Sequence, residues 1–167
     1  GKRLRVAPYP LVIDTFAALG ARGEALPYAE MQAALAAGTL DGQEAAPTTL
    51  AATRIGATAQ KFVTRWGAFA DVMIFAVRRP VWDGWNDAQR AVVRTAAQAA
   101  AAEAEAPQRE EAALADLTKH GITLVRLAPA QRAAFRTAVD GVWKKWTPAI
   151  GAEAVAAAEA AVAAVPK

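Results

Sequence analysis

The stretch at residues 26–47 constrains the fold of this chain more than any other. Its first half carries apolar side chains at helical spacing and stops at Gly38, a residue suited to the left-handed conformation that ends many helices. Thr39 and Leu40 then form a short strand candidate, and an Asp-Gly pair at residues 41–42 predicts a turn after it. A helix, a glycine stop and a short strand together make half of a βαβ unit.

The polar residues after this strand candidate indicate a binding site. Ligands of open α/β sheets lie beyond the carboxyl ends of the strands. Gln43, Glu44 and Ala45 occupy that place in the sequence. We therefore expect these three residues to face whatever the protein binds.

The rest of the chain alternates strand and helix patterns. We expect strands at residues 3–8, near Ala25 and Leu26, and at 61–66, 72–77 and 121–125, and helices at residues 11–19, 47–55, 86–120, 129–146 and 150–164. The segment 72–77 is almost entirely apolar, which predicts a strand buried on both faces. This order predicts an α/β fold in which helices flank a mostly parallel sheet.

The longest helical pattern begins at a capping box formed by Asn86 and Gln89 and continues to His120. At about 1.5 Å per residue it would span roughly 50 Å, which is longer than one lobe of this size. Pro107 lies inside the pattern and has no N–H for the helical hydrogen bond. We expect a kink there.

Composition excludes several classes of function. The chain is 54% hydrophobic and 21% charged, enough for a sizeable core, and its net charge of +3 is spread without the clustered cations of a nucleic-acid interface. Cysteine is absent and histidine occurs once, so thiol chemistry, disulfides, His/Cys metal sites and a cofactor are not expected. No stretch reaches the roughly 20 apolar residues of a membrane span. With no signal peptide or initiator Met, we interpret the chain as a fragment or a processed piece.

Five motifs occur in a fixed order: Arg3-Leu4-Arg5-Val6, Pro27-Tyr28-Ala29-Glu30, Leu40-Asp41-Gly42-Gln43-Glu44, Val81-Trp82-Asp83-Gly84-Trp85 before an Ala-rich helix, and Leu117 to Gly121 before a strand. Together they resemble the solute-binding proteins of tripartite ATP-independent periplasmic (TRAP) transporters. The Asp-Gly-Gln-Glu run is the most specific motif. The resemblance covers nearly all of this chain but only the C-terminal part of the family.

The resemblance implies a receptor with two α/β lobes that close on an organic acid. Residues 1–70 and 111–167 would form the second, C-terminal lobe. Residues 71–110 would belong to a first lobe outside this chain, as a strand and half of a helix that bridges both lobes. The resemblance also implies a periplasmic location and delivery of the solute to TRAP transporter membrane subunits, with no nucleic-acid binding, membrane insertion or catalysis.

The resemblance also implies which residues bind the solute. An arginine in the first strand of this lobe clamps the ligand carboxylate in the family, and Arg5 matches it. A guanidinium suits this role because it offers two parallel donors to a carboxylate. Tyr28 matches an aromatic position close to the ligand. Arg3, two residues before the clamp, is expected at the surface.

Three other positions lack the polar groups that a polyhydroxylated ligand would need. Ala45 stands where the family often has asparagine, and Pro8 and Gly67 stand where polar side chains would serve such a ligand. Trp66 and Phe69 lie beside Gly67 in the sequence. We therefore expect a monocarboxylate with an aliphatic or aromatic body, a class that includes 2-oxo and 2-hydroxy acids.

Other interpretations remain open from the residues alone. Asp41 and Glu44 could supply paired carboxylates for acid–base catalysis in a small α/β enzyme. The alternative, which we favour, places Asp41 in a turn and Glu44 in a hydrogen bond at the strand end. Without the family, the residues favour a solvated or ion-paired strand position for Arg5, because arginine is seldom fully buried. The Ala-rich tail at residues 150–164 could also belong to a helical interaction module.

Overall fold

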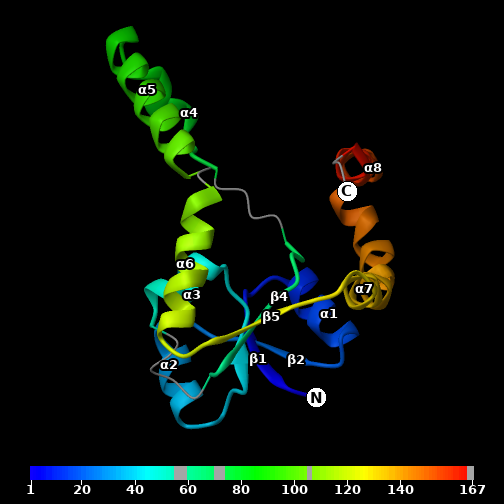
Figure 1. The fold of residues 1–167 in the computed structure, drawn as a ribbon. Coiled ribbons are helices and arrows are strands. Elements are labelled where there is room, and N and C mark those ends of the chain that lie inside the picture. Colours follow the sequence, from blue (N-terminus) through cyan, green and yellow to red (C-terminus); the bar gives the residue numbers. More distant parts are fainter. Residues whose placement is uncertain (55–59, 70–73, 105–106, 165–167) are drawn as a thin grey trace.

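Five short strands, all paired in parallel, form two small sheets in the computed structural model, which describes residues 1–54, 60–69, 74–104 and 107–164 (Figure 1). In the first sheet, β1 (Arg3–Val6) lies between β2 (Arg22–Ala25) and β3 (Gly42–Gln43). In the second, β4 (Phe62–Arg65) pairs with β5 (Thr123–Arg126). The predicted α/β class with parallel pairing is confirmed.

Most helices in the described part of the chain lie close to the predicted positions, although the short helix at Arg79–Asp83 was not predicted. The helices are α1 (Pro10–Ala18), α2 (Tyr28–Ala36), α3 (Pro47–Ala52), α4 (Arg79–Asp83), α5 (Asp87–Ala104), α6 (Pro107–Lys119), α7 (Pro129–Ile150) and α8 (Ala152–Ala164). Pro10, Pro47 and Pro129 each stand in the first turn, where the missing proline N–H leaves no hydrogen bond unmade. No helix in the described part of the chain is long and apolar enough to cross a membrane.

The two faces of β1 have different environments, because side chains of a strand alternate between its faces. Val6 is fully buried against Val12 and Phe16 of α1. The opposite face carries Arg3 and Arg5 and lies toward α2, whose Met31 and Leu35 form a second small core with Leu40. A third cluster of Leu50, Leu117 and Ile122 joins α3 to α6. The helices thus leave a polar row of strand side chains on one side of the first sheet.

The strand predicted at Thr39 and Leu40 is wrong in position, because β3 begins three residues later at Gly42. The N–H groups of Thr39 and Leu40 both donate to the Ala34 carbonyl and so complete the end of α2. Leu40 is buried in the core with α2. Residues 39–41 therefore form the turn at the end of α2, with Asp41 as its last residue, and β3 starts after them.

The strand predicted at residues 72–77 is wrong for the part that the structure describes. Residues 74–77 form no strand, and the side chains of Ile74 and Phe75 are 79% and 71% exposed. Residues 72–73 lie outside the described residues. A strand needs a neighbour for its backbone groups, and no described strand pairs with this segment.

The long helical pattern is divided into α5 and α6 at the position of the predicted kink, although residues 105–106 between them lie outside the described residues. The capping box at its start is confirmed. The Gln89 N–H donates to Asn86 Oδ1 at 2.9 Å, and the Asn86 N–H donates to Gln89 Oε1 at 3.0 Å. Figure 1 shows α4 and α5 projecting away from the two sheets.

Candidate functional site

Arg5 lies one residue before the end of β1 and is held by the segment that enters α2. Its Nε donates to the Leu26 carbonyl at 3.2 Å, and its guanidinium carbon lies 5.5 Å from the centre of the Tyr28 ring. The structure therefore brings together Arg5 and Tyr28. The attraction between a guanidinium and an aromatic face restrains the orientation of the arginine side chain.

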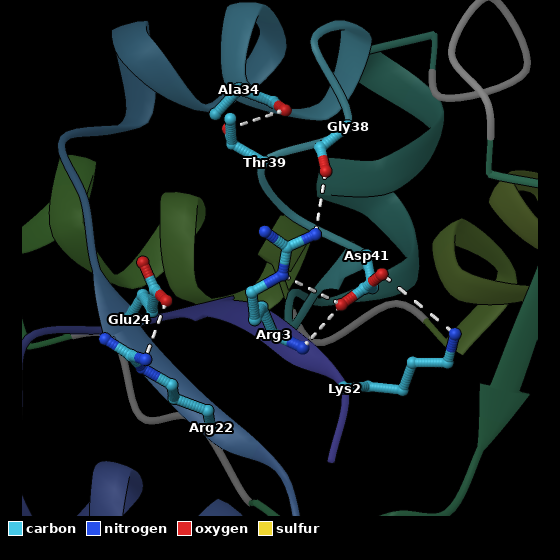
Figure 2. Close-up of polar contacts among 8 residues, drawn as sticks. All are labelled: Lys2, Arg3, Arg22, Glu24, Ala34, Gly38, Thr39 and Asp41. Atoms are coloured by element: carbon cyan, nitrogen blue, oxygen red, sulfur yellow. Dashed lines mark hydrogen bonds and ion pairs between the residues drawn. The ribbon is translucent and has the colours of Figure 1, made fainter.

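Two carboxylates close to Arg5 in the pairing of the first sheet, Glu24 and Asp41, are bound to other cations. Glu24 stands in register with Arg5 on β2, but its carboxylate forms an ion pair with Arg22, whose Nε lies 3.3 Å away (Figure 2). Asp41, before β3, accepts from Arg3. No described ion pair involves Arg5, so its positive charge has no carboxylate partner among the described residues.

Arg3 fixes the loop after α2 to the start of β1 (Figure 2). Its Nη2 donates to the Gly38 carbonyl at 2.7 Å, and its backbone N–H donates to Asp41 Oδ2 at 2.7 Å. Arg3 side-chain Nε also donates to Asp41, at 3.3 Å. The side chain of Arg3 is 40% exposed, as expected at the surface, yet these bonds give it a structural role.

The same bonds bear on the enzyme interpretation. The hydrogen bonds from the Arg3 backbone and side chain, with the nearby Lys2 charge, lower the pKa of Asp41 below its ordinary value. A carboxylate that stays charged and paired is a poor general acid at neutral pH. Asp41 therefore serves the turn. Among the described residues, no group of histidine and acidic side chains could hold a metal ion.

Gln43 is the unusual member of the site. It stands in register with Arg5 on β3, so the two side chains leave the sheet on the same face. Its Oε1 and Nε2 are buried and have no hydrogen-bond partner. Because buried polar groups are almost always hydrogen-bonded, this amide needs an explanation.

The two residues that follow Gln43 have different surroundings. The Glu44 backbone N–H donates to the Arg5 carbonyl at 2.9 Å, which extends the pairing of β3 with β1. Ala45 packs against the core cluster of Leu50, Leu117 and Ile122. Ala45 thus contributes to the interior of the molecule.

Trp66, Gly67 and Phe69 belong to a separate aromatic group after β4. The Trp66 ring lies 5.8 Å from Phe16, 5.9 Å from Phe69 and 5.3 Å from Phe135, all centre to centre. Gly67 has φ of +63°, a conformation that favours glycine and turns the chain between the two aromatic residues. The described hydrogen bonds and ring contacts do not join this group to Arg5. The predicted site residues therefore fall into two groups.

One residue in each of these two groups was not predicted from the sequence, Leu26 beside Arg5 and Phe135 beside Trp66. Leu26 acts through its backbone carbonyl, which no side-chain pattern reveals. Phe135 reaches Trp66 from α7, about 70 positions away in the sequence. An aromatic residue at helical spacing in α7 is indistinguishable from an ordinary core residue, so the sequence held no usable signal for it.

Comparison with a family model matches residues 1–148 to the description "Bacterial extracellular solute-binding protein, family 7". A search of curated proteins finds no match to this chain.

Solved structures give similar results. A TRAP periplasmic solute-binding protein from Ralstonia eutropha H16, with bound (S)-2-acetolactate, is 39% identical over 98% of this chain, with a TM-score of 0.88. One from Ochrobactrum anthropi, with its C-terminus in the ligand-binding pocket, is 28% identical over 96%, with a TM-score of 0.77. One from Shewanella oneidensis, with bound succinate, is 22% identical over 96% and shares the fold, with a TM-score of 0.81. The chain covers 54%, 50% and 53% of these three proteins, which is about half of each.

Proposed function

The chain belongs to family 7 of the bacterial extracellular solute-binding proteins, and on this premise we propose that it supplies the carboxylate-binding lobe of a periplasmic TRAP receptor. The receptor binds an organic carboxylate between two lobes and delivers it to TRAP transporter membrane subunits. No covalent bond changes. The ligand drives closure because it binds the closed state better than the open one.

The environment of Arg5 is the observation that carries this proposal. The Leu26 carbonyl and the Tyr28 ring restrain the guanidinium, while the flanking carboxylates are bound elsewhere. A restrained cation without a carboxylate partner in the described part of the chain is matched by a ligand that brings one. The paired N–H groups of a guanidinium bind both oxygens of a carboxylate.

A second lobe outside this chain completes the receptor in this proposal. The chain spans about half of its solved relatives. The side chains of Ile74, Phe75 and Val92 are 79%, 71% and 69% exposed, and a pocket of about 310 Å³ lies between residues 75–82 and α5. Apolar surface of this kind is suited to a protein partner, and we assign residues 71–110 to the first lobe.

We propose that the ligand is a monocarboxylate with an apolar body. The centre of the Tyr28 ring lies 5.5 Å from the guanidinium carbon of Arg5, and the ring offers an apolar face to the body of a ligand held there. Pro8, three residues after Arg5, has no side-chain donor or acceptor. Each ligand hydroxyl left unpaired on closure would cost about 1–3 kcal/mol. The protein from Ralstonia eutropha holds (S)-2-acetolactate, which supports a small monocarboxylate, although this ligand also carries one hydroxyl and one oxo group.

A thermal-shift panel of organic acids on the complete receptor tests the proposal. A true ligand at 100 times its Kd stabilises the folded protein by about 2.7 kcal/mol. We expect aliphatic or aromatic monocarboxylates to give the largest shifts, and the acid to be recovered unchanged. Tight binding of a sugar acid, with none of an aliphatic or aromatic acid, would contradict the ligand class. Turnover of the acid would contradict the receptor function.

A further inference from the structure

We propose that Gln43 is a positioning residue for Arg5. In the ligand-bound receptor its amide oxygen accepts a hydrogen bond from an Arg5 Nη and fixes the plane of the guanidinium that faces the carboxylate. This inference rests on the proposed function and assigns a role to a side chain that the fold leaves unexplained.

The first support is the placement of Arg5 between two anchors. On the β2 side, the Leu26 carbonyl accepts from Arg5 Nε. On the β3 side, Gln43 is the register partner of Arg5, and neighbouring strands are only about 4.8 Å apart. A change in side-chain torsions, with no movement of the backbone, can bring an Nη of Arg5 to the amide of Gln43.

The second support is that, among the described residues, Gln43 has a hydrogen-bond acceptor without a donor, while Arg5 has donors without an acceptor. Gln43 Oε1 is a buried acceptor without a partner. Arg5 has five N–H donors, and the described residues engage one of them. A hydrogen bond from Arg5 therefore satisfies the amide oxygen. The amide nitrogen keeps its donors, and an oxygen of the bound carboxylate is an acceptor of the right kind for them.

An unpaired buried amide also argues against a purely structural role. The Gln43 side chain makes no hydrogen bond that holds β3 in place, and the backbone alone pairs this two-residue strand with β1. Leucine has a similar volume and lacks the unpaired atoms. Replacing this glutamine by leucine should therefore leave the fold intact or stabilise it, while function suffers.

The test uses Gln43→Leu and Gln43→Glu in the complete receptor, with calorimetric titration of the acid that gives the largest thermal shift and (S)-2-acetolactate as the first probe. We expect Gln43→Leu to keep or raise the Tm of the unliganded protein and to weaken binding at least tenfold. Gln43→Glu should weaken binding further, because its carboxylate competes for Arg5. Gln98→Leu, the same change on the exposed face of α5, is the matched control and should leave binding unchanged.

Arg5→Ala separates the failure of this inference from failure of the proposed function. If Arg5→Ala binds as the wild type does, the carboxylate clamp itself is wrong. If Arg5→Ala abolishes binding and Gln43→Leu binds within twofold of wild type, only the positioning role is overturned. A crystal structure of the liganded receptor decides the matter even if a variant fails to fold. A hydrogen bond between Gln43 Oε1 and an Arg5 Nη supports the proposal, and an amide that stays unpaired refutes it.

Discussion

Two regions of this chain differ in how far their apolar side chains are buried. In the body, formed by the two sheets with α1, α2, α3 and α6, the side chains of Val6 and Met31 are fully buried. In the arm, residues 74–104, those of Phe75 and Val92 are 71% and 69% exposed. Both regions are rich in apolar residues. The difference shows that an apolar pattern in the sequence favours burial but does not identify the surface that covers the apolar side chains.

The arm is nevertheless well ordered on its polar side. Arg90 donates to the carbonyls of Trp82 and Asp83 at 3.0 and 3.1 Å, which closes the end of α4. The guanidinium of Arg94 lies 4.9 Å from the Trp82 ring. These contacts build a preformed surface with its apolar face uncovered in the described residues. That arrangement is what the proposed contact with a first lobe requires.

The largest expected effect is the loss of ligand binding when Arg5 is replaced. This loss would show that the binding site lies in the body. Removing one partner of a desolvated charge pair costs about 2–5 kcal/mol, which is roughly thirtyfold to several thousandfold in Kd. Arg5→Lys should lose most of the affinity too, because a point charge cannot replace the planar fork. Calorimetric titration of the complete receptor measures both changes.

Arg132→Ala provides the matched control, since Arg132 is an exposed arginine on α7, which belongs neither to the arm nor to the residues around Arg5. It should bind as the wild type does. If Arg5→Ala binds the acid within threefold of wild type, Arg5 does not bind the carboxylate, and the proposed site loses its central residue.

Two stability variants test the comparison directly in the complete receptor. Met31→Ala should destabilise the body by about 2–5 kcal/mol, because it empties a fully buried site. Val92→Asp should destabilise the receptor by about 1–3 kcal/mol if the first lobe covers this face, because it buries an unpaired charge. Gln98→Asp is the control on the same helix. Denaturant unfolding measures all three, and a silent Val92→Asp would mean that the arm stays exposed.

The sequence predicted the body well because its signals are local. Gly38 ends α2, proline begins α1, α3 and α7, and the Asn86–Gln89 box begins the helix of the arm, all as the residue types dictate. The order of strands and helices then follows. The strand at Thr39 and Leu40 failed because apolar, β-permissive residues can equally complete a helix end and enter the core.

The site was less predictable, because its defining features are tertiary. Tyr28 and Arg5 were paired only through the family resemblance, and no pattern in the sequence reveals that the amide of Gln43 is buried without a partner. The separation of Trp66 from Arg5 depends on which face of β1 each one approaches. The strand predicted at residues 72–77 failed for residues 74–77 because an apolar run in the sequence does not show whether a neighbouring strand is present to pair with it.

Arg3→Ala should have a smaller effect and one of a different kind from Arg5→Ala. Arg3 donates to Gly38 and Asp41 and fixes the loop that leads to β3. Exposed hydrogen bonds of this kind contribute little to stability. We expect a lower Tm with affinity close to wild type. Loss of affinity without loss of stability would place Arg3 in the binding site and end the distinction between the two arginines.

The smallest expected effect concerns the contact of α7 with α1, which extends the body toward the C-terminus. Asp14 accepts hydrogen bonds from Lys145 Nζ and Trp146 Nε1, both at 2.7 Å, and these bonds lower its pKa below the ordinary value of 3.8. A carboxyl whose pKa is lower in the folded state stabilises the fold above the pKa of the unfolded chain. That contribution is lost as the pH falls through the folded pKa. Wild type should therefore exceed Asp14→Asn slightly in Tm at pH 7, and the gap should shrink below about pH 4. Added salt should also narrow it, because the pair is exposed. A gap that is independent of pH and salt would show that Asp14 acts through packing rather than through its charge.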